Sequence, residues 1–134
     1  LKKNMILKQT VLLTSDKSGL NLIKTFHLYG GFFRKRSKIG FFGKGSAKIA
    51  INKKYKNMNI KRKIKKIRKG QIARVILTRQ NYRMFRFDSS CLYTYDNSCI
   101  TFKKQKILRS KYIFGPIFRN FRRCKYKNLF KITI

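Results

Sequence analysis

The chain has 134 residues, of which 36 are Lys or Arg and only three are acidic, so its formal net charge is +33. Such a charge destabilises a compact state that stands alone in water, yet 43% of the residues are hydrophobic and 14% aromatic, well above the content of a disordered tail. Composition therefore excludes a simple disordered polycation and predicts one domain, over residues 1–134, that a large anion neutralises. Nucleic acid is the first candidate for that anion and an anionic membrane surface the second.

Apolar runs and cysteines restrict the class of protein further. No apolar run approaches the roughly 20 residues of a transmembrane helix, and Lys8 interrupts the first run, which argues against a signal peptide. Cys91, Cys99 and Cys124 form no C-x-x-C pair and are odd in number, so we expect small buried apolar residues in a reducing compartment. The preference for Lys, Ile, Asn, Phe and Tyr, which share A/T-rich codons, is typical of an organelle genome.

Branched and aliphatic runs predict two strands near the N-terminus. Residues 5–13 form the first run and residues 20–29 the second. In the turn at residues 15–19 the Asp16 carboxylate can accept backbone amides, and Gly19 tolerates positive φ. Alternation along the second strand predicts one apolar face, formed by Leu20, Leu22, Phe26 and Leu28.

Glycines separate the second strand from the third. Gly30 and Gly31 end the alternation, and residues 32–38 (FFRKRSK) form a short basic loop with two aromatic side chains. Residues 39–45, with glycines at positions 40, 43 and 45, predict a bend or bulge, after which residues 46–51 resume as a strand.

Residues 53–69 (KKYKNMNIKRKIKKIRK) contain ten cations and no acid, with apolar residues between the charges. Cations packed this closely repel one another, so the stretch makes physical sense beside a polyanion. We interpret it as a basic hairpin loop between two strand ends, and a disordered arm without specific contacts is the alternative.

Short strands and turns continue as far as residue 102. Residues 71–78 predict a buried strand, and residues 81–87 predict a basic and aromatic one. A hairpin turn at 88–90 leads to a strand over 91–95, and after a second turn residues 99–102 form the last strand. This spacing predicts a mainly β fold, a small antiparallel β-barrel with a β-hairpin extension.

The last third of the chain has helical character. Pro116 suits the first turn of a helix, and apolar residues follow it at helical spacing. We expect a helical segment over residues 113–124, which amounts to one or two short C-terminal helices. The side chains expected to pack on the barrel are Phe114, Ile117 and Phe121, and those expected to face away from it are Arg119, Arg122 and Arg123.

Residues 113–122 (IFGPIFRNFR) resemble the family of large-subunit ribosomal protein 14, which ends in an I-F-G-P-V-x-R-E-L-R-like segment. Short motifs elsewhere follow in the family's order, and residues 16–19 (DKSG) are similar to its D-N-S-G. A later family acid matches Asp96 rather than Asp88, because the distance from Asp96 to Ile113 fits better. The remaining matches are Met5-Ile6, Gln9-Thr10, Gly30-Gly31, Arg34, Arg36, Gly40, Ser46, Lys48, Ala50, Lys69-Gly70, Arg79 and Arg109.

The chain departs from the family pattern in two respects. Phe41, Gln71 and Asn120 stand where the family has acids, which raises the net positive charge. The connection from Ile51 to Gly70 is longer than the family's usual hairpin. Most of the basic stretch is therefore an insertion, and the resemblance does not say what it contacts.

The resemblance implies a five-stranded barrel with short carboxy-terminal helices that is a structural part of the large ribosomal subunit and binds its rRNA. It also implies a place near the subunit interface, beside proteins resembling large-subunit proteins 3 and 19, and a part in a bridge to small-subunit rRNA. Together with the codon preference, it indicates a mitochondrial ribosome and a protein encoded in the organelle. A general nucleic-acid-binding protein of the nucleoid type is the alternative.

Cations and aromatic side chains are the candidate rRNA contacts. Lys and Arg displace counterions from phosphates, whereas recognition of one site needs shape, groove contacts or stacking. Four aromatic residues beside cations (Phe32, Phe33, Tyr82 and Phe85) are candidates for stacking on bases, or else for packing in the core or against proteins. The candidate rRNA-binding cations are Arg34, Lys35, Arg36, Lys38, Lys48, Lys53, Lys54, Lys56, Lys61, Arg62, Lys63, Lys65, Lys66, Arg68, Lys69, Arg79, Arg83, Arg86, Arg109, Lys111, Arg119, Arg122 and Arg123.

The sequence offers little for catalysis or metal binding. The three Asp side chains lie in predicted turns, and His27 is alone on the polar face of a strand. Cys91 and Cys99 would need further metal ligands, and residues 43–45 (GKG) lack the frame of a nucleotide-binding loop. We therefore predict no enzymatic activity, no metal, no cofactor, no membrane partner and no small-molecule substrate.

Overall fold

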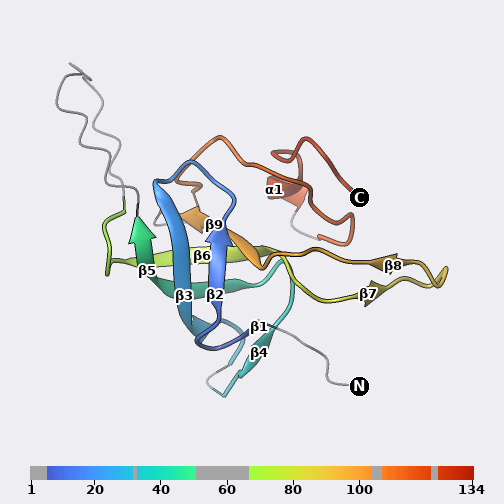
Figure 1. Ribbon diagram of the computed structural model, residues 1–134, viewed down its shortest axis with the longest axis horizontal. Helices are drawn as coiled ribbons and strands as arrows, with labels where there is room; N and C mark the ends of the chain where they lie inside the picture. Colours follow the sequence, from blue (N-terminus) through green and yellow to red (C-terminus); the bar gives the residue numbers. More distant parts are fainter. Residues whose placement is uncertain (1–5, 32, 51–66, 104–106, 122–123) are drawn as a thin grey trace.

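The structure, a computed structural model, describes residues 6–31, 33–50, 67–103, 107–121 and 124–134 (Figure 1). Within these residues the fold is mainly β, as predicted, and the only helix has four residues. None of the described helical structure is long and apolar enough to cross a membrane. The elements are β1 (Ile6–Leu7), β2 (Val11–Thr14), β3 (Leu20–Leu28), β4 (Arg36–Ser37), β5 (Phe42–Ala50), β6 (Ile72–Arg79), β7 (Met84–Phe85), β8 (Cys91–Leu92), β9 (Ser98–Phe102) and α1 (Cys124–Lys127).

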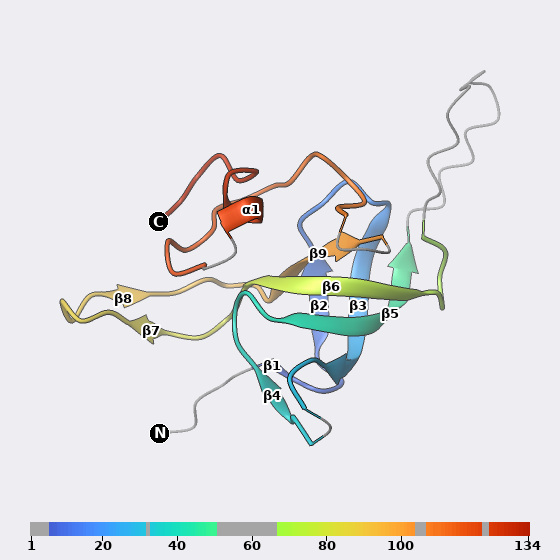
Figure 2. The same cartoon turned by 180° about the vertical axis from the view of Figure 1, so that it is seen from behind.

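Strands β2, β3, β5, β6 and β9 form a closed barrel in that order, which confirms the predicted five-stranded barrel (Figures 1 and 2). Four neighbouring pairs are antiparallel, whereas β2 and β9 run parallel, with Leu13 opposite Ser98 and Thr14 opposite Cys99. The expectation of a wholly antiparallel barrel is therefore wrong at this pair. Five strands cannot alternate in direction all the way round a closed ring, so one adjacent pair has to be parallel.

A turn divides the strand that was predicted over residues 5–13. Gln9 has a φ of 67°, in the left-handed region, and its backbone N–H donates to the carbonyl of Thr25 at 2.7 Å. Before this turn β1 pairs with β4 outside the barrel, and after it β2 enters the barrel. The sequence pattern missed the turn because apolar residues continue on both sides of Gln9.

Strand β3 confirms the second predicted strand but not its predicted apolar face. Its register with β5 shifts between Leu20 and Leu22, between Leu22 and Ile23, and between Thr25 and His27. A shift by one residue moves the following side chains to the other face of a sheet. The buried side chains of β3 are consequently Leu20, Ile23, Thr25 and Leu28, while Phe26 is 43% exposed and Leu22 is half-buried.

Strand β5 begins at Phe42, so it includes two of the glycines that were expected to form a bend. Gly43 and Gly45 are buried and lie on the same face of β5 as Ala47, which belongs to the barrel core. A Cβ on Gly45 would clash with the side chain of Ile23 and lie 2.9 Å from the carbonyl oxygen of Lys24. These glycines therefore allow β3 and β5 to approach closely and do not mark the end of a strand.

The interior of the barrel holds one apolar core. Every strand of the barrel contributes to it, and β1 and the residue Ile67 cover its ends. Its members are Ile6, Leu12, Leu20, Ile23, Ala47, Ile67, Ala73, Val75, Leu77 and Cys99.

A second core lies on the outside of the barrel, between β6, β9 and the C-terminal segment of residues 113–134. Ile76, Ile100 and Phe102 alternate with the interior residues of their strands and meet the C-terminal segment. Because both faces of β9 are covered, all five of its residues are buried. The C-terminal side chains buried in this core are Ile117, Phe121, Tyr126 and Phe130.

The helix predicted over residues 113–124 is not present in the described part of that segment. Ile113 forms an isolated bridge with Asp16 and Ile117 forms another with Thr133, so the chain runs extended here, and the helix α1 begins only at Cys124. Gly115 has a φ of +83°, which a right-handed helix does not tolerate. Ile117 and Phe121 are buried as expected, but Phe114 is 51% exposed, so its expected packing role is wrong.

The hairpin of β7 and β8 confirms the predicted turn at residues 88–90. Met84 pairs with Leu92 and Phe85 with Cys91, and the two strands project away from the barrel (Figures 1 and 2). Most of the predicted basic hairpin, residues 53–66, lies outside the described residues, as does Phe32.

Gly45→Ala is expected to lower the free energy of unfolding by about 1–3 kcal/mol, because the added Cβ overpacks the contact with Ile23. Ser46→Ala, at the next and half-buried position of β5, is the control and should change it by less than about 0.5 kcal/mol. Chemical denaturation in a sulfate buffer, followed by circular dichroism, measures both variants. Equal stability of the two would contradict the close approach of β3 and β5.

Candidate nucleic-acid interface

The three carboxylates of the chain are all held by hydrogen bonds within the protein. Oδ1 of Asp88 accepts the backbone N–H of Ser90 at 3.1 Å and its hydroxyl at 2.7 Å. These hydrogen bonds, that of the hydroxyl first, lower the pKa of Asp88. Asp88 therefore closes the β7–β8 turn, as its predicted position implied.

Asp16 is buried and links three parts of the chain. Its Oδ1 accepts the backbone N–H of Ser18 at 3.2 Å and its hydroxyl at 2.5 Å, which closes the turn before β3. Its Oδ2 accepts the backbone N–H of Thr101 at 2.7 Å and its hydroxyl at 2.6 Å, on β9. The bridge between Asp16 and Ile113 adds the C-terminal segment. Asp16 thus stabilises the turn, as predicted, and also holds this turn against β9.

Asp96 and Arg79 form an ion pair that connects the barrel to the C-terminal segment. Nε and Nη2 of Arg79 donate to Oδ2 of Asp96 at 3.1 and 2.9 Å. Nη1 donates to the carbonyls of Phe114 at 3.1 Å and Pro116 at 3.4 Å. The Arg79 side chain is only 11% exposed. The guanidinium of Arg79 thus donates its hydrogen bonds to groups of the protein itself, and we do not propose Arg79 as an rRNA contact.

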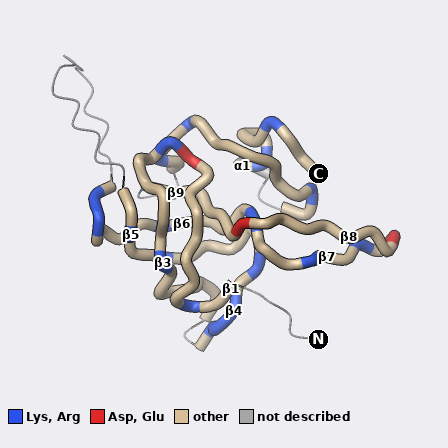
Figure 3. Tube along the Cα trace, in the orientation of Figure 1, with Lys and Arg blue, Asp and Glu red and all other residues tan. Residues whose placement is uncertain are grey.

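Three carboxylates cannot balance the remaining positive charge. The chain has 36 cations for three acids, and each acid already accepts the bonds described above. Most of the charge must therefore be neutralised from outside the protein. Figure 3 shows the described Lys and Arg residues spread over several sides of the chain instead of one patch.

The described rRNA-binding candidates are mostly on the surface. Ten others, in the basic stretch and after Phe121, lie outside the described residues and stay predictions. Arg34, Arg79, Arg86 and Arg109 are half-buried. The exposed candidates are Lys35, Arg36, Lys38, Lys48, Arg68, Lys69, Arg83, Lys111 and Arg119, and those not described are Lys53, Lys54, Lys56, Lys61, Arg62, Lys63, Lys65, Lys66, Arg122 and Arg123.

Arg34 organises the basic loop between β3 and β5. Its guanidinium lies 4.3 Å from the ring centroid of Phe41, and Nη1 donates to the carbonyl of Tyr29 at 3.2 Å. Nε donates to the carbonyl of Arg36 at 3.0 Å. These contacts hold the loop in shape, and Arg36 and its neighbour Lys35 remain exposed at its surface.

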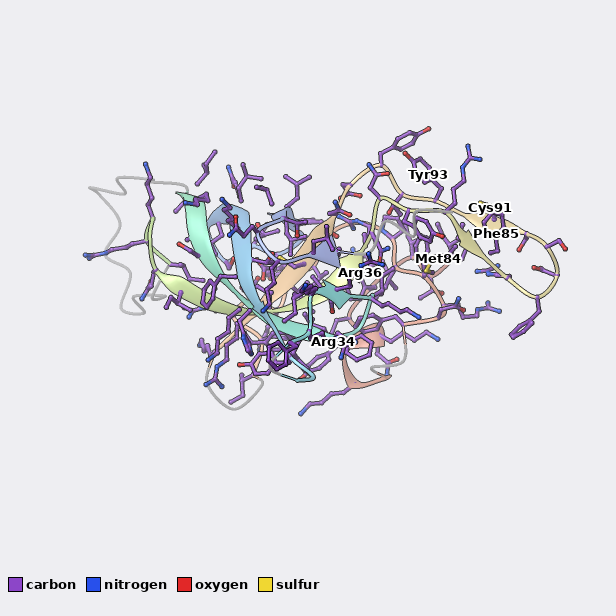
Figure 4. The ribbon with its side chains drawn as sticks, turned by 90° about the horizontal axis from the view of Figure 1, so that it is seen from below. Arg34, Arg36, Met84, Phe85, Cys91 and Tyr93 are labelled. Atoms are coloured by element: carbon purple, nitrogen blue, oxygen red, sulfur yellow. The ribbon has the colours of Figure 1, made fainter. Side chains whose placement is uncertain are left out.

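The β7–β8 hairpin presents aromatic side chains to solvent. Phe85 is 71% exposed, and Phe87, Tyr93 and Tyr95 are exposed as well. Figure 4 shows Met84, Phe85, Cys91 and Tyr93 along the hairpin, with Arg34 and Arg36 on the side of the barrel. Phe85 is consequently not a core residue, which leaves base stacking and protein contact as its possible functions.

Sequence reasoning missed a row of cations on the outer face of the barrel. Lys24 on β3 lies opposite Ser46, and Lys44 on β5 lies opposite Arg74 on β6. Like charges placed directly opposite each other on adjacent strands repel. In the sequence these cations stand between residues that face the barrel interior. Their alignment across the strands can be predicted only when the register of β3 and β5 is known.

The two described cysteines differ in environment. Cys99 is buried in the barrel core, and its burial, with the charge of Asp16 second, raises the pKa of its thiol well above the ordinary value. Cys91 is exposed on β8, so the expectation that all the cysteines are buried is wrong for this residue.

The described residues contain no group of three or more His, Cys, Asp or Glu side chains that could hold a metal ion. His27 packs edge-on against Tyr29, with 5.3 Å between the ring centroids. The three carboxylates accept the hydrogen bonds described above.

Comparison with known proteins identifies a family and a similar protein. Residues 5–133 match the family Ribosomal protein L14p/L23e. The chain is also similar to the large ribosomal subunit protein uL14m of Tetrahymena pyriformis, with 29% identity over 126 residues that cover 94% of this chain and 97% of that protein.

Asp96→Asn is expected to lower the free energy of unfolding by about 1–2 kcal/mol, because the largely buried Arg79 loses its counterion. The exposed turn variant Asp88→Asn is the control and should lower it by less, because Asn keeps an Oδ1 that can accept both hydrogen bonds from Ser90. Denaturant titration measures both. A loss for Asp96→Asn no larger than that of the control would show that the ion pair does not hold the C-terminal segment.

Cys99 should resist alkylation in the folded protein while Cys91 reacts rapidly, because only Cys91 is exposed and burial keeps the Cys99 thiol protonated. Treatment with a maleimide followed by peptide mass spectrometry distinguishes the two sites. In denaturant both thiols should react at similar rates. Rapid labelling of Cys99 without denaturant would mean that the barrel interior is open.

Proposed function

The chain belongs to the ribosomal protein L14p/L23e family, and from this premise we infer that it is a structural constituent of the large subunit of a mitochondrial ribosome. The uL14m name of the Tetrahymena relative, in which the final letter denotes the mitochondrial form, supports the organelle. The preference for amino acids that have A/T-rich codons supports synthesis inside that organelle. In this role the protein is not an enzyme but a scaffold that holds folded rRNA.

The observation that carries the proposed rRNA binding is the imbalance of charge. Each of the three acids is engaged within the protein, and the chain has 36 cations. Phosphates of rRNA supply the missing negative charge, and each phosphate contact releases condensed counterions. The rigid barrel spreads these cations over several sides, which suits a protein surrounded by folded RNA (Figure 3).

The proposed phosphate contacts among the described residues are the exposed candidates Lys35, Arg36, Lys38, Lys48, Arg68, Lys69, Arg83, Lys111 and Arg119. Arg34 supports them indirectly because it braces the β3–β5 loop. Cations of the basic insertion extend this set. Phosphate contacts set position and orientation, so we assign recognition of the rRNA site to shape and to stacking by exposed aromatic side chains.

We assign the β7–β8 hairpin to the subunit interface. It projects from the barrel and carries Phe85, Phe87 and Tyr95 in exposed positions. Exposed aromatic residues of this kind are enriched in protein–protein contacts. The neighbours proposed are the large-subunit proteins resembling proteins 3 and 19, and the proposed bridge is to small-subunit rRNA.

The test is sedimentation of the tagged chain from mitochondrial extracts at increasing salt. We expect it to travel with large subunits, to stay with them in moderately high salt, and to be released by ribonuclease. Release by deoxyribonuclease instead, with no material in the subunit fraction, would establish the nucleoid-type alternative and overturn the assignment.

A triple variant with Arg36→Gln, Lys38→Gln and Arg119→Gln should reduce the log–log salt slope of rRNA binding by about 2–3, since each phosphate contact contributes roughly 0.7–0.9. The triple variant with Lys8→Gln, Lys125→Gln and Lys131→Gln is the matched control, because it loses the same charge at exposed positions outside the proposed set. Filter binding of purified large-subunit rRNA measures both slopes. Equal reductions would mean that only net charge matters.

A further inference from the structure

A pocket of about 270 Å³ opens on the outer face of the barrel. It is lined by Tyr29, Phe42, Arg74, Phe102 and Lys103. These residues lie at the end of β3, the start of β5, on β6 and at the end of β9, which are neighbours in the barrel order (Figure 2). The pocket adjoins the second core, because Phe42 and Phe102 contribute to both.

Aromatic rings form the walls of the pocket, and the fold holds them in place. Phe42 and Phe102 meet edge to face with 5.6 Å between their centroids. Phe102 also packs against Tyr126, with 5.1 Å between the ring centroids, and is only 2% exposed. The backbone N–H of Tyr29 donates to the carbonyl of Phe42 at 3.1 Å. Walls that are already ordered lose little conformational freedom when a flat ligand binds between them.

Cations surround the opening. Arg74 and Lys103 line the pocket and are exposed. Nζ of Lys44 lies 5.8 Å from the ring centroid of Tyr29, and Lys44 is directly opposite Arg74 across β5 and β6. A bound anion would relieve the repulsion between these two cations, since the acids of the chain accept bonds elsewhere. An apolar aromatic interior thus meets a positively charged rim.

We propose that this pocket binds one unpaired base of an RNA, with the adjacent phosphates held by Lys44, Arg74 and Lys103. The proposal rests on the proposed function and adds the kind of RNA feature that the chain recognises. Proteins recognise unpaired RNA bases by stacking them on aromatic side chains. The volume is just below the roughly 300–1,000 Å³ of sites for drug-sized ligands, which suits a single base.

Tyr29→Leu is the principal test variant, because it removes one aromatic wall and keeps an apolar side chain outside both cores. Tyr29→Phe keeps the ring and is the matched control. For purified full-length chain and a short single-stranded RNA, Tyr29→Leu should weaken binding by about fivefold or more, as expected for the loss of base stacking. Tyr29→Phe should bind as the unaltered chain does.

Base-specific chemical probing of large subunits that contain the same variants measures the reactivity of the rRNA bases. One unpaired rRNA base should gain reactivity with Tyr29→Leu and stay protected with Tyr29→Phe. Lys103→Gln, which changes an exposed side chain and leaves both cores intact, should increase the reactivity of the same base. Ultraviolet crosslinks from Tyr29 should lead to that nucleotide.

The two proposals fail in different ways. If the chain travels with large subunits but neither Tyr29→Leu nor Lys103→Gln changes RNA affinity or the probing pattern, the pocket proposal is overturned. Crosslinks from Tyr29 to a neighbouring protein would also overturn it and assign the pocket to a protein side chain. If the chain never enters the subunit fraction and Tyr29→Leu still weakens RNA binding, the pocket proposal is supported and the ribosomal assignment falls.

Discussion

The shortage of acids is the constraint on which the rest of this structure depends. With three carboxylates for 36 cations, the chain uses two of the acids, Asp16 and Asp96, to join segments that are far apart in the sequence. Asp16 binds the turn before β3 and the backbone of β9, and Asp96 holds Arg79 against the C-terminal segment. Two of the three negative charges thus hold parts of the fold together, and most of the described cations are exposed.

The C-terminal segment gives the small barrel a second apolar layer. It covers the outer faces of β6 and β9, so residues that would be exposed on an isolated barrel, such as Ile76 and Ile100, are buried. Arg79 keeps the segment extended because it bonds the carbonyls of Phe114 and Pro116. The pocket of Tyr29 and Phe42 lies at the edge of this layer, where the barrel meets the surface.

Local sequence signals predicted the barrel well, because strands and turns leave short-range patterns. The runs that became β6 and β9, and the turn at Asp88, depend on neighbouring residues alone.

The predictions that were wrong concern features that depend on residues far away in the sequence. The bulges of β3 moved Phe26 outward, and Gly45 is required by Ile23 on the next strand. Ile117 and Phe121 have helical spacing, but Gly115 and the contacts of Arg79 determine the conformation of their segment. The pairing of Lys44 with Arg74 was missed for the same reason, because it follows from the register of β5 with β6.

The parallel pairing of β2 with β9 has a consequence for synthesis on the ribosome that makes this chain. Residues 13 and 14 can pair with β9 only when residues 98 and 99 have been made, although Leu13 already pairs with Leu22 on β3. A nascent chain that ends earlier has an open sheet with an unpaired edge on β2, which is prone to pairing with other chains. Closing so long a loop is slow compared with forming local hairpins. The edge of β2 that pairs with β9 therefore stays open until β9 has been made.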